Sequence, residues 1–190
     1  MFILVLAFAL SAQAADTTGT WAIQDLQVAN RIQFSLHVTE GGKGNFQSSS
    51  EFDVSQVQGL TMTQMASSSG TIVRFEIMRE AGTFICEGYF KAGNGAGTFL
   101  FKPSLSFSSQ MATLGFSDVA EDRLFSMALH DIGMRYAAEI QAMGLKVPTA
   151  SKLIAMKIHG VTPEYIRKMQ ARWPEITLDQ LISLRIHGID

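Results

Sequence analysis

Cysteine is nearly absent from this chain of 190 residues, since Cys86 is its only one. An internal disulfide is therefore excluded, and the hydrophobic core must supply the stability that small exported proteins often take from disulfides. Cys86 lies in the strand-like stretch TFICEGYF, which contains neither a histidine nor a cation. We therefore expect a buried, unreactive thiol, because a reactive one needs a neighbour that favours the thiolate.

The chain also lacks a basic field and the common enzyme signatures. Its formal net charge is −2, so nothing in the composition attracts nucleic acid. The sequence contains no HExxH, GxSxG, GKS, GKT or CxxC motif. The glycines of GNGAG (93–97) separate two strand-like segments, which indicates a hairpin turn rather than a phosphate loop. We therefore predict a protein that is not an enzyme and that binds no metal or cofactor.

The N-terminus resembles an export signal. Residues 1–14, MFILVLAFALSAQA, join an apolar run to the small-x-small pattern Ala12-Gln13-Ala14, so the mature chain is expected to start near Ala15. The apolar run is about half of the ~20 residues that a membrane-spanning helix needs. We expect a periplasmic or secreted bacterial protein without stable membrane insertion after cleavage. No Lys or Arg precedes the run, which leaves a start site further upstream open.

Residues 15–103 carry the two-residue period of β-strands. In RIQFSLHV, the side chains of Ile32, Phe34, Leu36 and Val38 share one face, and NFQSSSEF offers a polar returning strand suited to a sheet edge. The segments TIVRFEIM, TFICEGYF and TFLFKP form a second set joined by short turns. This pattern predicts a small antiparallel β-sandwich or a partly open barrel.

Two groups of residues in this half invite a functional interpretation. Glu80 and Glu87 flank the second set of strands with Arg79 nearby, and they form either surface charge pairs, which we expect, or a binding site. Large aromatic residues either fill the core or line a cavity for a small apolar ligand. The candidate cavity residues are Trp21, Phe34, Phe75 and Phe84.

Residues 104–190 change to the helical period, and the chain repeats itself. The blocks LFSMALHDI, LIAMKIHGV and LISLRIHGI begin at residues 124, 153 and 181. Aromatic residues at 107, 136 and 165 extend the register at a spacing of 29. The sequence predicts an array of three helix-turn-helix units, 104–132, 133–161 and 162–190, so the whole chain is α+β. One such pair cannot bury its apolar side alone, so the units must stack.

Helix ends account for the histidines of this array. His130, His159 and His187 stand at one repeat position, where a stacked row cannot converge on a metal ion. We interpret them as caps at the negative helix ends, with Gly160 and Gly188 as closing residues. In the third unit, Thr162 and Pro163 are expected to start a helix.

Basic residues on the helical half offer one possible interaction surface. Lys157 and Arg185 hold equivalent positions, and Arg167 and Lys168 lie on the intervening predicted helix. They form either a stripe that binds another protein or an ordinary solvated face.

The segments LIAMKIHGVTPEYIRKMQA and LISLRIHGI resemble a short helical repeat of exported bacterial proteins. That repeat also occurs as an accessory tail of antirepressor-type membrane metallopeptidases, relatives of the β-lactam sensors. The resemblance implies an accessory module and no chemistry, because the peptidase motif and membrane helices are missing here. The first unit departs from the pattern at Ala128, Asp131 and Gly133, as a terminal or interface unit would.

Together these observations predict an exported, non-catalytic module for protein binding or sensing, with the helical units as its interaction surface. The expected partner is another protein, such as a membrane-bound sensor or peptidase. The alternatives are a β domain that binds a small apolar ligand and an enzyme of an unrecognised type.

Overall fold

The computed structural model describes residues 17–26, 28, 30–39, 45–145, 147 and 149–189. The predicted signal peptide, residues 1–14, lies outside these ranges. Within them, no helix combines the length and the apolar character needed to cross a membrane.

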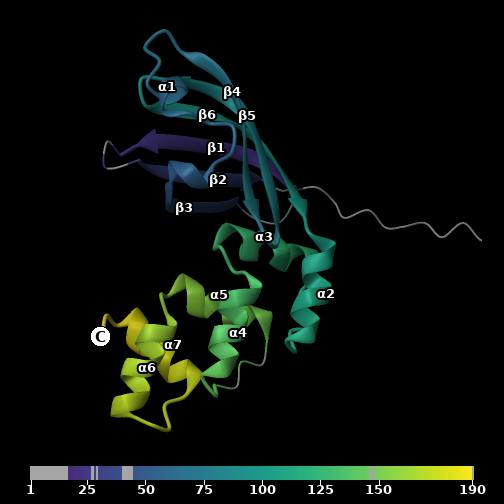
Figure 1. Ribbon diagram of the computed structural model, residues 1–190, viewed down its shortest axis with the longest axis vertical. Helices are drawn as coiled ribbons and strands as arrows, with labels where there is room; N and C mark the ends of the chain where they lie inside the picture. Colours follow the sequence, from purple (N-terminus) through teal and green to yellow (C-terminus); the bar gives the residue numbers. More distant parts are fainter. Residues whose placement is uncertain are drawn as a thin grey trace, which may run out of the picture.

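The first half of the chain forms one six-stranded antiparallel sheet, as the two-residue period predicted (Figure 1). Its strands stand in the order β3-β2-β1-β6-β5-β4, so β3 and β4 are the two edges of an open sheet. The edge position expected for NFQSSSEF is confirmed. The bounds are β1 (Thr17–Asp25), β2 (Arg31–Thr39), β3 (Asn45–Asp53), β4 (Thr71–Arg79), β5 (Gly82–Lys91) and β6 (Asn94–Pro103). A 3-10 helix, η1 (Val54–Gln56), and α1 (Met62–Met65) connect β3 to β4.

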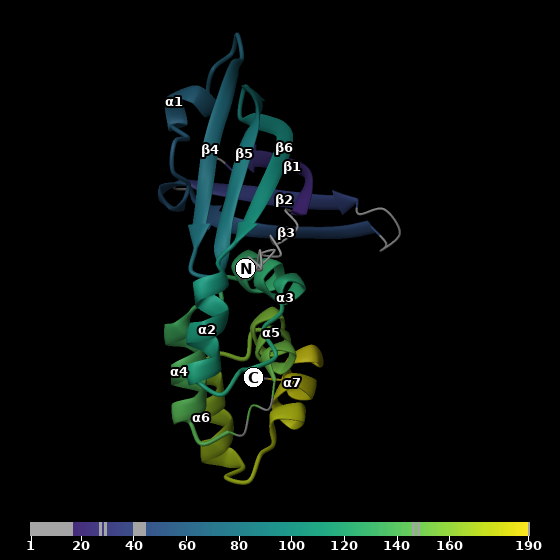
Figure 2. The same cartoon turned by 90° about the vertical axis from the view of Figure 1, so that its right-hand side faces the viewer.

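The sheet bends so strongly that its two halves face each other. Figure 2 shows β4, β5 and β6 running along the molecule while β1, β2 and β3 run across them. Trp21 of β1 and Phe75 of β4 are three strands apart, which is about 14 Å in a flat sheet, yet their ring centroids are 5.0 Å apart. Gly88 allows this approach, because a Cβ there would lie 2.6 Å from the Trp21 ring. The predicted inward face of β2 is confirmed, since Ile32, Phe34, Leu36 and Val38 are buried.

Six further helices follow the sheet. They are α2 (Leu105–Thr113), α3 (Glu121–Leu129), α4 (Met134–Ala142), α5 (Ala150–Ile158), α6 (Pro163–Arg172) and α7 (Leu178–Ile186). Figure 2 shows α2, α4 and α6 in one column and α3, α5 and α7 in a second one beside it. The α+β class and its order, an antiparallel sheet followed by helices, are therefore confirmed.

Aromatic rings join the sheet to the helices. Phe125 of α3 lies 5.6 Å from Phe84, 5.3 Å from Phe101 and 6.2 Å from Phe99, measured between ring centroids. The buried apolar residues of both halves consequently form one continuous cluster. Edge-to-face ring pairs of this kind add to the stabilisation that burial of the rings provides.

The turn between β4 and β5 completes the junction by two polar contacts. Arg79, whose side chain is 8% exposed, pairs with Asp131 at 3.3 Å. Glu80 accepts a hydrogen bond from the backbone N–H of Met134 at 3.1 Å. A Cβ at Gly133 would collide with this carboxylate, so a larger residue there would have to displace the Glu80 side chain. Two of the three departures of the first unit thus occur where the sheet contacts the helices.

Candidate functional site

The three repeated histidines lie at helix ends. His130, His159 and His187 are the C-cap residues of α3, α5 and α7. Each is followed by a residue with positive φ, at 51° for Asp131, 69° for Gly160 and 68° for Gly188. The next backbone N–H groups, of Ile132, Val161 and Ile189, donate to the carbonyls of Met127, Met156 and Leu184. This bond closes a Schellman motif at each end.

The start of α6 has the geometry that its sequence predicted. The hydroxyl of Thr162 accepts a hydrogen bond from the N–H of Tyr165 at 3.2 Å, and Pro163 occupies the first turn. Glu164 follows, and hydrogen bonds from backbone and side-chain groups there lower the pKa of its carboxyl. These contacts fix the start of the helix.

Three of the four basic candidates already contact other side chains of the same chain. The Lys157 ammonium lies 4.7 Å from the centroid of the Tyr136 ring, and the Arg185 guanidinium lies 4.7 Å from that of Tyr165. Arg167 pairs with Glu164 at 3.0 Å. Lys168 is exposed on α6.

The two tyrosines explain why Lys157 and Arg185 hold equivalent positions. Their hydroxyls donate to the carbonyls of Val161 and Ile189, just beyond α5 and α7. In the first unit, Phe107 and Ala128 replace the tyrosine and the cation together. Each stacked cation therefore joins two successive helices, α4 to α5 and α6 to α7.

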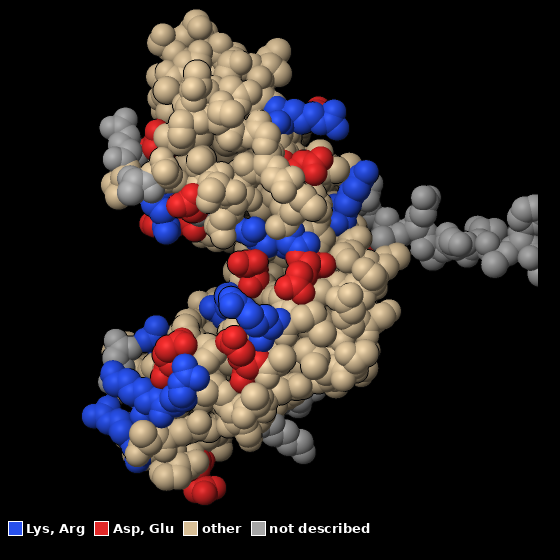
Figure 3. Space-filling model, viewed as in Figure 1, with Lys and Arg blue, Asp and Glu red and all other residues tan. Residues whose placement is uncertain are grey.

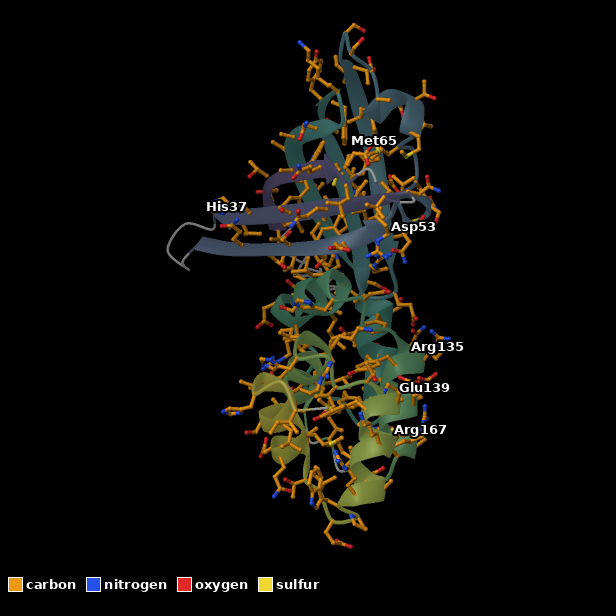
Figure 4. The ribbon with its side chains drawn as sticks, turned by 90° about the vertical axis from the view of Figure 1, so that its left-hand side faces the viewer. His37, Asp53, Met65, Arg135, Glu139 and Arg167 are labelled. Atoms are coloured by element: carbon orange, nitrogen blue, oxygen red, sulfur yellow. The ribbon has the colours of Figure 1, made fainter. Side chains whose placement is uncertain are left out.

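The surface of α4 and α6 carries a further set of charges. Figure 4 shows Arg135, Glu139 and Arg167 following one another along these two helices. Glu139 and Arg167 line a shallow hollow between the helices with Ala142, Met143, Pro163 and Glu164.

The four candidate cavity residues are all buried, at 2% exposure or less. Trp21 packs on Phe75 and on Phe90, with centroids 5.0 and 5.8 Å apart. Phe84 lies in the group of rings that contains Phe125 at the junction. The structure thus places the four among packed rings, and an apolar ligand between them stays a prediction.

Sequence reasoning missed a groove at the far end of the helices. It holds about 550 Å³ between the end of α6 and the outer side of α7. Trp173 is 47% exposed there. The lining residues are Arg172, Trp173, Pro174, Glu175, Ile176, Gln180, Ser183 and Leu184.

The repeat register shows what is unusual about this groove. Leu184 corresponds to Met127 and Met156, which are fully buried, whereas Leu184 is only partly buried. In the same register, Trp173 corresponds to Gly115 and Gly144, which are spaced 29 residues apart and have positive φ. A tryptophan at a repeat position otherwise held by glycine was the sequence signal that could have indicated the groove.

Positive charge gathers near the groove. Figure 3 shows a group of Lys and Arg side chains over α6 and α7. Lys168 and Arg172 are exposed and one helical turn apart on α6, and Arg172 lies over the Trp173 ring at 5.6 Å. The groove therefore joins apolar surface to the Arg172 cation and the Glu175 carboxylate, with Lys168 one helical turn before Arg172.

No protein-family model matches the sequence, and neither the curated proteins nor the solved structures contain a match to this chain.

Proposed function

We propose that residues 104–190 are three stacked units of one helical hairpin, 104–132, 133–161 and 162–190. The first support is the spacing of the helices, since α2, α4 and α6 begin at residues 105, 134 and 163. The second is a recurring hydrogen bond between successive hairpins. The amide of Gln141 donates to the Leu114 carbonyl, and 29 residues later Gln170 donates to the Met143 carbonyl.

Contacts between the second helices of the hairpins recur in the same way. Arg123 donates from Nε to the hydroxyl of Ser151 at 3.0 Å. One unit further on, Lys152 occupies the position of Arg123 and donates to Asp179, which corresponds to Ser151. Each unit therefore has a forward face that contacts the next unit and a rear face that contacts the previous one. The groove at Trp173 lies on the forward face of the third unit.

On this basis, the protein is an exported, non-catalytic binding module that recognises another protein through its helical half. The observation that supports the function is the exposed, largely apolar groove on the forward face of the third unit. Trp173 and Arg172 belong to the residue types that dominate binding energy at protein interfaces. Exposed apolar patches beside polar residues are typical of protein interaction sites. The predicted signal peptide supports export.

Site-specific photocrosslinking tests this function. A benzoylphenylalanine residue is placed at Ser183, which is exposed in the groove, and in a matched variant at Ala96, which is exposed on the sheet. We expect the Ser183 variant to form one discrete protein adduct in cells, and the Ala96 variant to form none. Trp173→Ala should abolish this adduct while the circular dichroism of the protein stays unchanged.

Two results would overturn the function. One is the same set of adducts from both crosslinker positions, and the other is an adduct at residue 183 that persists in full after Trp173→Ala.

A further inference from the structure

Resting on the proposed function, we infer that the partner contributes a helical hairpin, which packs on the forward face of the third unit as a fourth layer. The face continues an interface that the chain forms twice within itself. In both cases a helical hairpin covers it, α4–α5 on the first unit and α6–α7 on the second. Met127 and Met156 are fully buried and lie one helical turn after Arg123 and Lys152, which bond to the next hairpin from the same helix face.

The internal interfaces also define the polar contact that the partner makes. The carbonyls of Leu114 and Met143, at the ends of α2 and α4, accept an amide hydrogen bond from the hairpin that covers them. In the repeat register the corresponding residue is Arg172, the last residue of α6, which ends at the C-cap Trp173. Because the donor is a glutamine on the first helix of the covering hairpin in both internal interfaces, we expect a glutamine or asparagine at that position of the partner hairpin to donate to the end of α6.

The forward face of the third unit differs in charge from the forward faces of the first and second units. Lys168 corresponds to Glu139 and Gln110, and Arg172 corresponds to Met143 and Leu114. The forward face of the third unit therefore carries two cations at positions where the other units carry none. Carboxylates on the partner hairpin would face these cations and add specificity.

A second copy of the chain does not offer a rear face that could cover the forward face of the third unit. The rear faces of its second and third units are already covered by the units before them, so only the rear face of its first unit could serve. There, Phe125 and Leu129 of α3 are buried beneath the sheet, at 9% and 4% exposure. The structure therefore favours a different protein as the source of the hairpin.

A synthetic peptide of residues 161–189 serves as the probe, because in this hairpin Gln170 already donates to the unit before it and Glu164 lines the hollow between α4 and α6. The peptide is added to the full-length, isotopically labelled protein, and amide chemical shifts are recorded by NMR. We expect saturable shifts centred on Gln180, Ser183 and Leu184, together with a gain of helical circular dichroism in the mixture. Replacing Gln170 by Ala in the peptide should weaken binding about five-fold, the worth of one neutral hydrogen bond. Leu184→Asp in the protein should abolish the shifts.

Three outcomes would overturn the inference. They are the absence of shifts at the groove, binding without a gain of helicity, and concentration-dependent self-association of the protein that Leu184→Asp removes. The second result indicates an extended peptide as the occupant, and the third indicates a second copy. If the crosslink at residue 183 forms while the probe fails, protein binding stands and only the helical form of the partner is wrong.

Discussion

Glu80, in the turn between β4 and β5, accepts a hydrogen bond from the backbone N–H of Met134, and so caps α4 from a different part of the fold. Helix α6 has a local cap instead, because Thr162 caps it with its own hydroxyl. Gly133 occupies the position of Thr162 and has no side chain to offer. The Glu80 carboxylate from the sheet thus replaces the helix cap that Gly133 cannot provide.

Glu80→Ala should lower the free energy of unfolding by about 1 kcal/mol, because it removes a helix cap and a negative charge at the positive helix end. Urea denaturation followed by circular dichroism measures this change. Glu87→Ala is the matched control, since Glu87 pairs with Arg74 at the exposed surface and should change stability by less than about 0.5 kcal/mol.

A double-mutant cycle tests whether Gly133 and Glu80 act as a pair. Gly133→Ser should destabilise the wild-type protein, because its Cβ meets the Glu80 carboxylate. In the Glu80→Ala background the same change should stabilise, because the serine can then cap α4 itself. Purely additive effects would show that the two residues are not coupled.

Much of this architecture was visible in the sequence, because its local patterns are dictated by burial and by helix ends. Alternation revealed the inward face of β2, and Thr162-Pro163 revealed the start of α6. The bend of the sheet was not predictable, because the contact of Trp21 with Phe75 joins strands that are distant in sequence. The departures at Asp131 and Gly133 did indicate an interface. Their partners could not be named, since charged turn residues such as Arg79 and Glu80 show no periodic pattern.

The pair formed by Arg79 and Asp131 predicts effects of different size for two substitutions at Asp131. Asp131 has φ of 51°, a conformation that asparagine tolerates and glycine adopts freely. Asp131→Asn should lower the free energy of unfolding by about 0.5–1 kcal/mol, since it removes the exposed carboxylate charge that faces the buried Arg79 side chain. Asp131→Gly loses the same pair but relieves the backbone, so its net effect should lie closer to zero. Both are measured by urea denaturation. In 1 M salt the cost of Asp131→Asn should shrink, and a cost unaffected by salt would contradict the ion-pair explanation.

Substitution of Phe125 measures how much the contact between the sheet and the helices contributes to stability. Phe125→Ala should cost about 3–5 kcal/mol, because it leaves a cavity among the rings of Phe84, Phe99 and Phe101. Ile154→Ala, at the corresponding position of α5, should cost much less, since Ile154 is only partly buried. Equal losses in thermal or urea unfolding would show that the junction contributes no more than an ordinary helix contact.

Cys86 should be inert in the folded protein. Its side chain is fully buried, and burial raises the pKa of the thiol to about 12. At pH 8 the thiolate fraction is then roughly one in ten thousand. Ellman's reagent should react with Cys86 only as fast as the protein unfolds, and fully in 6 M urea. Rapid labelling of the native protein, at a rate that does not follow unfolding, would contradict this burial.

Protonation of His130 is expected to lower the stability of the folded protein in mild acid. Burial lowers the pKa of its imidazole, and the positive charge of Lys157 lowers it further. Because the folded state disfavours the charged form, His130 contributes stability above the ordinary histidine pKa of about 6.5, and this contribution is lost as the pH falls through the folded pKa. His130→Gln should therefore flatten the fall of unfolding free energy as the pH decreases below about 6.5. His187→Gln is the matched control, because His187 caps α7 in the same way but is exposed. Lys157→Met should raise the pKa of His130, measured by NMR titration of the ring protons. An unchanged titration would exclude Lys157 as a cause, and an unchanged acid slope in His130→Gln would exclude His130 as the source of the acid sensitivity.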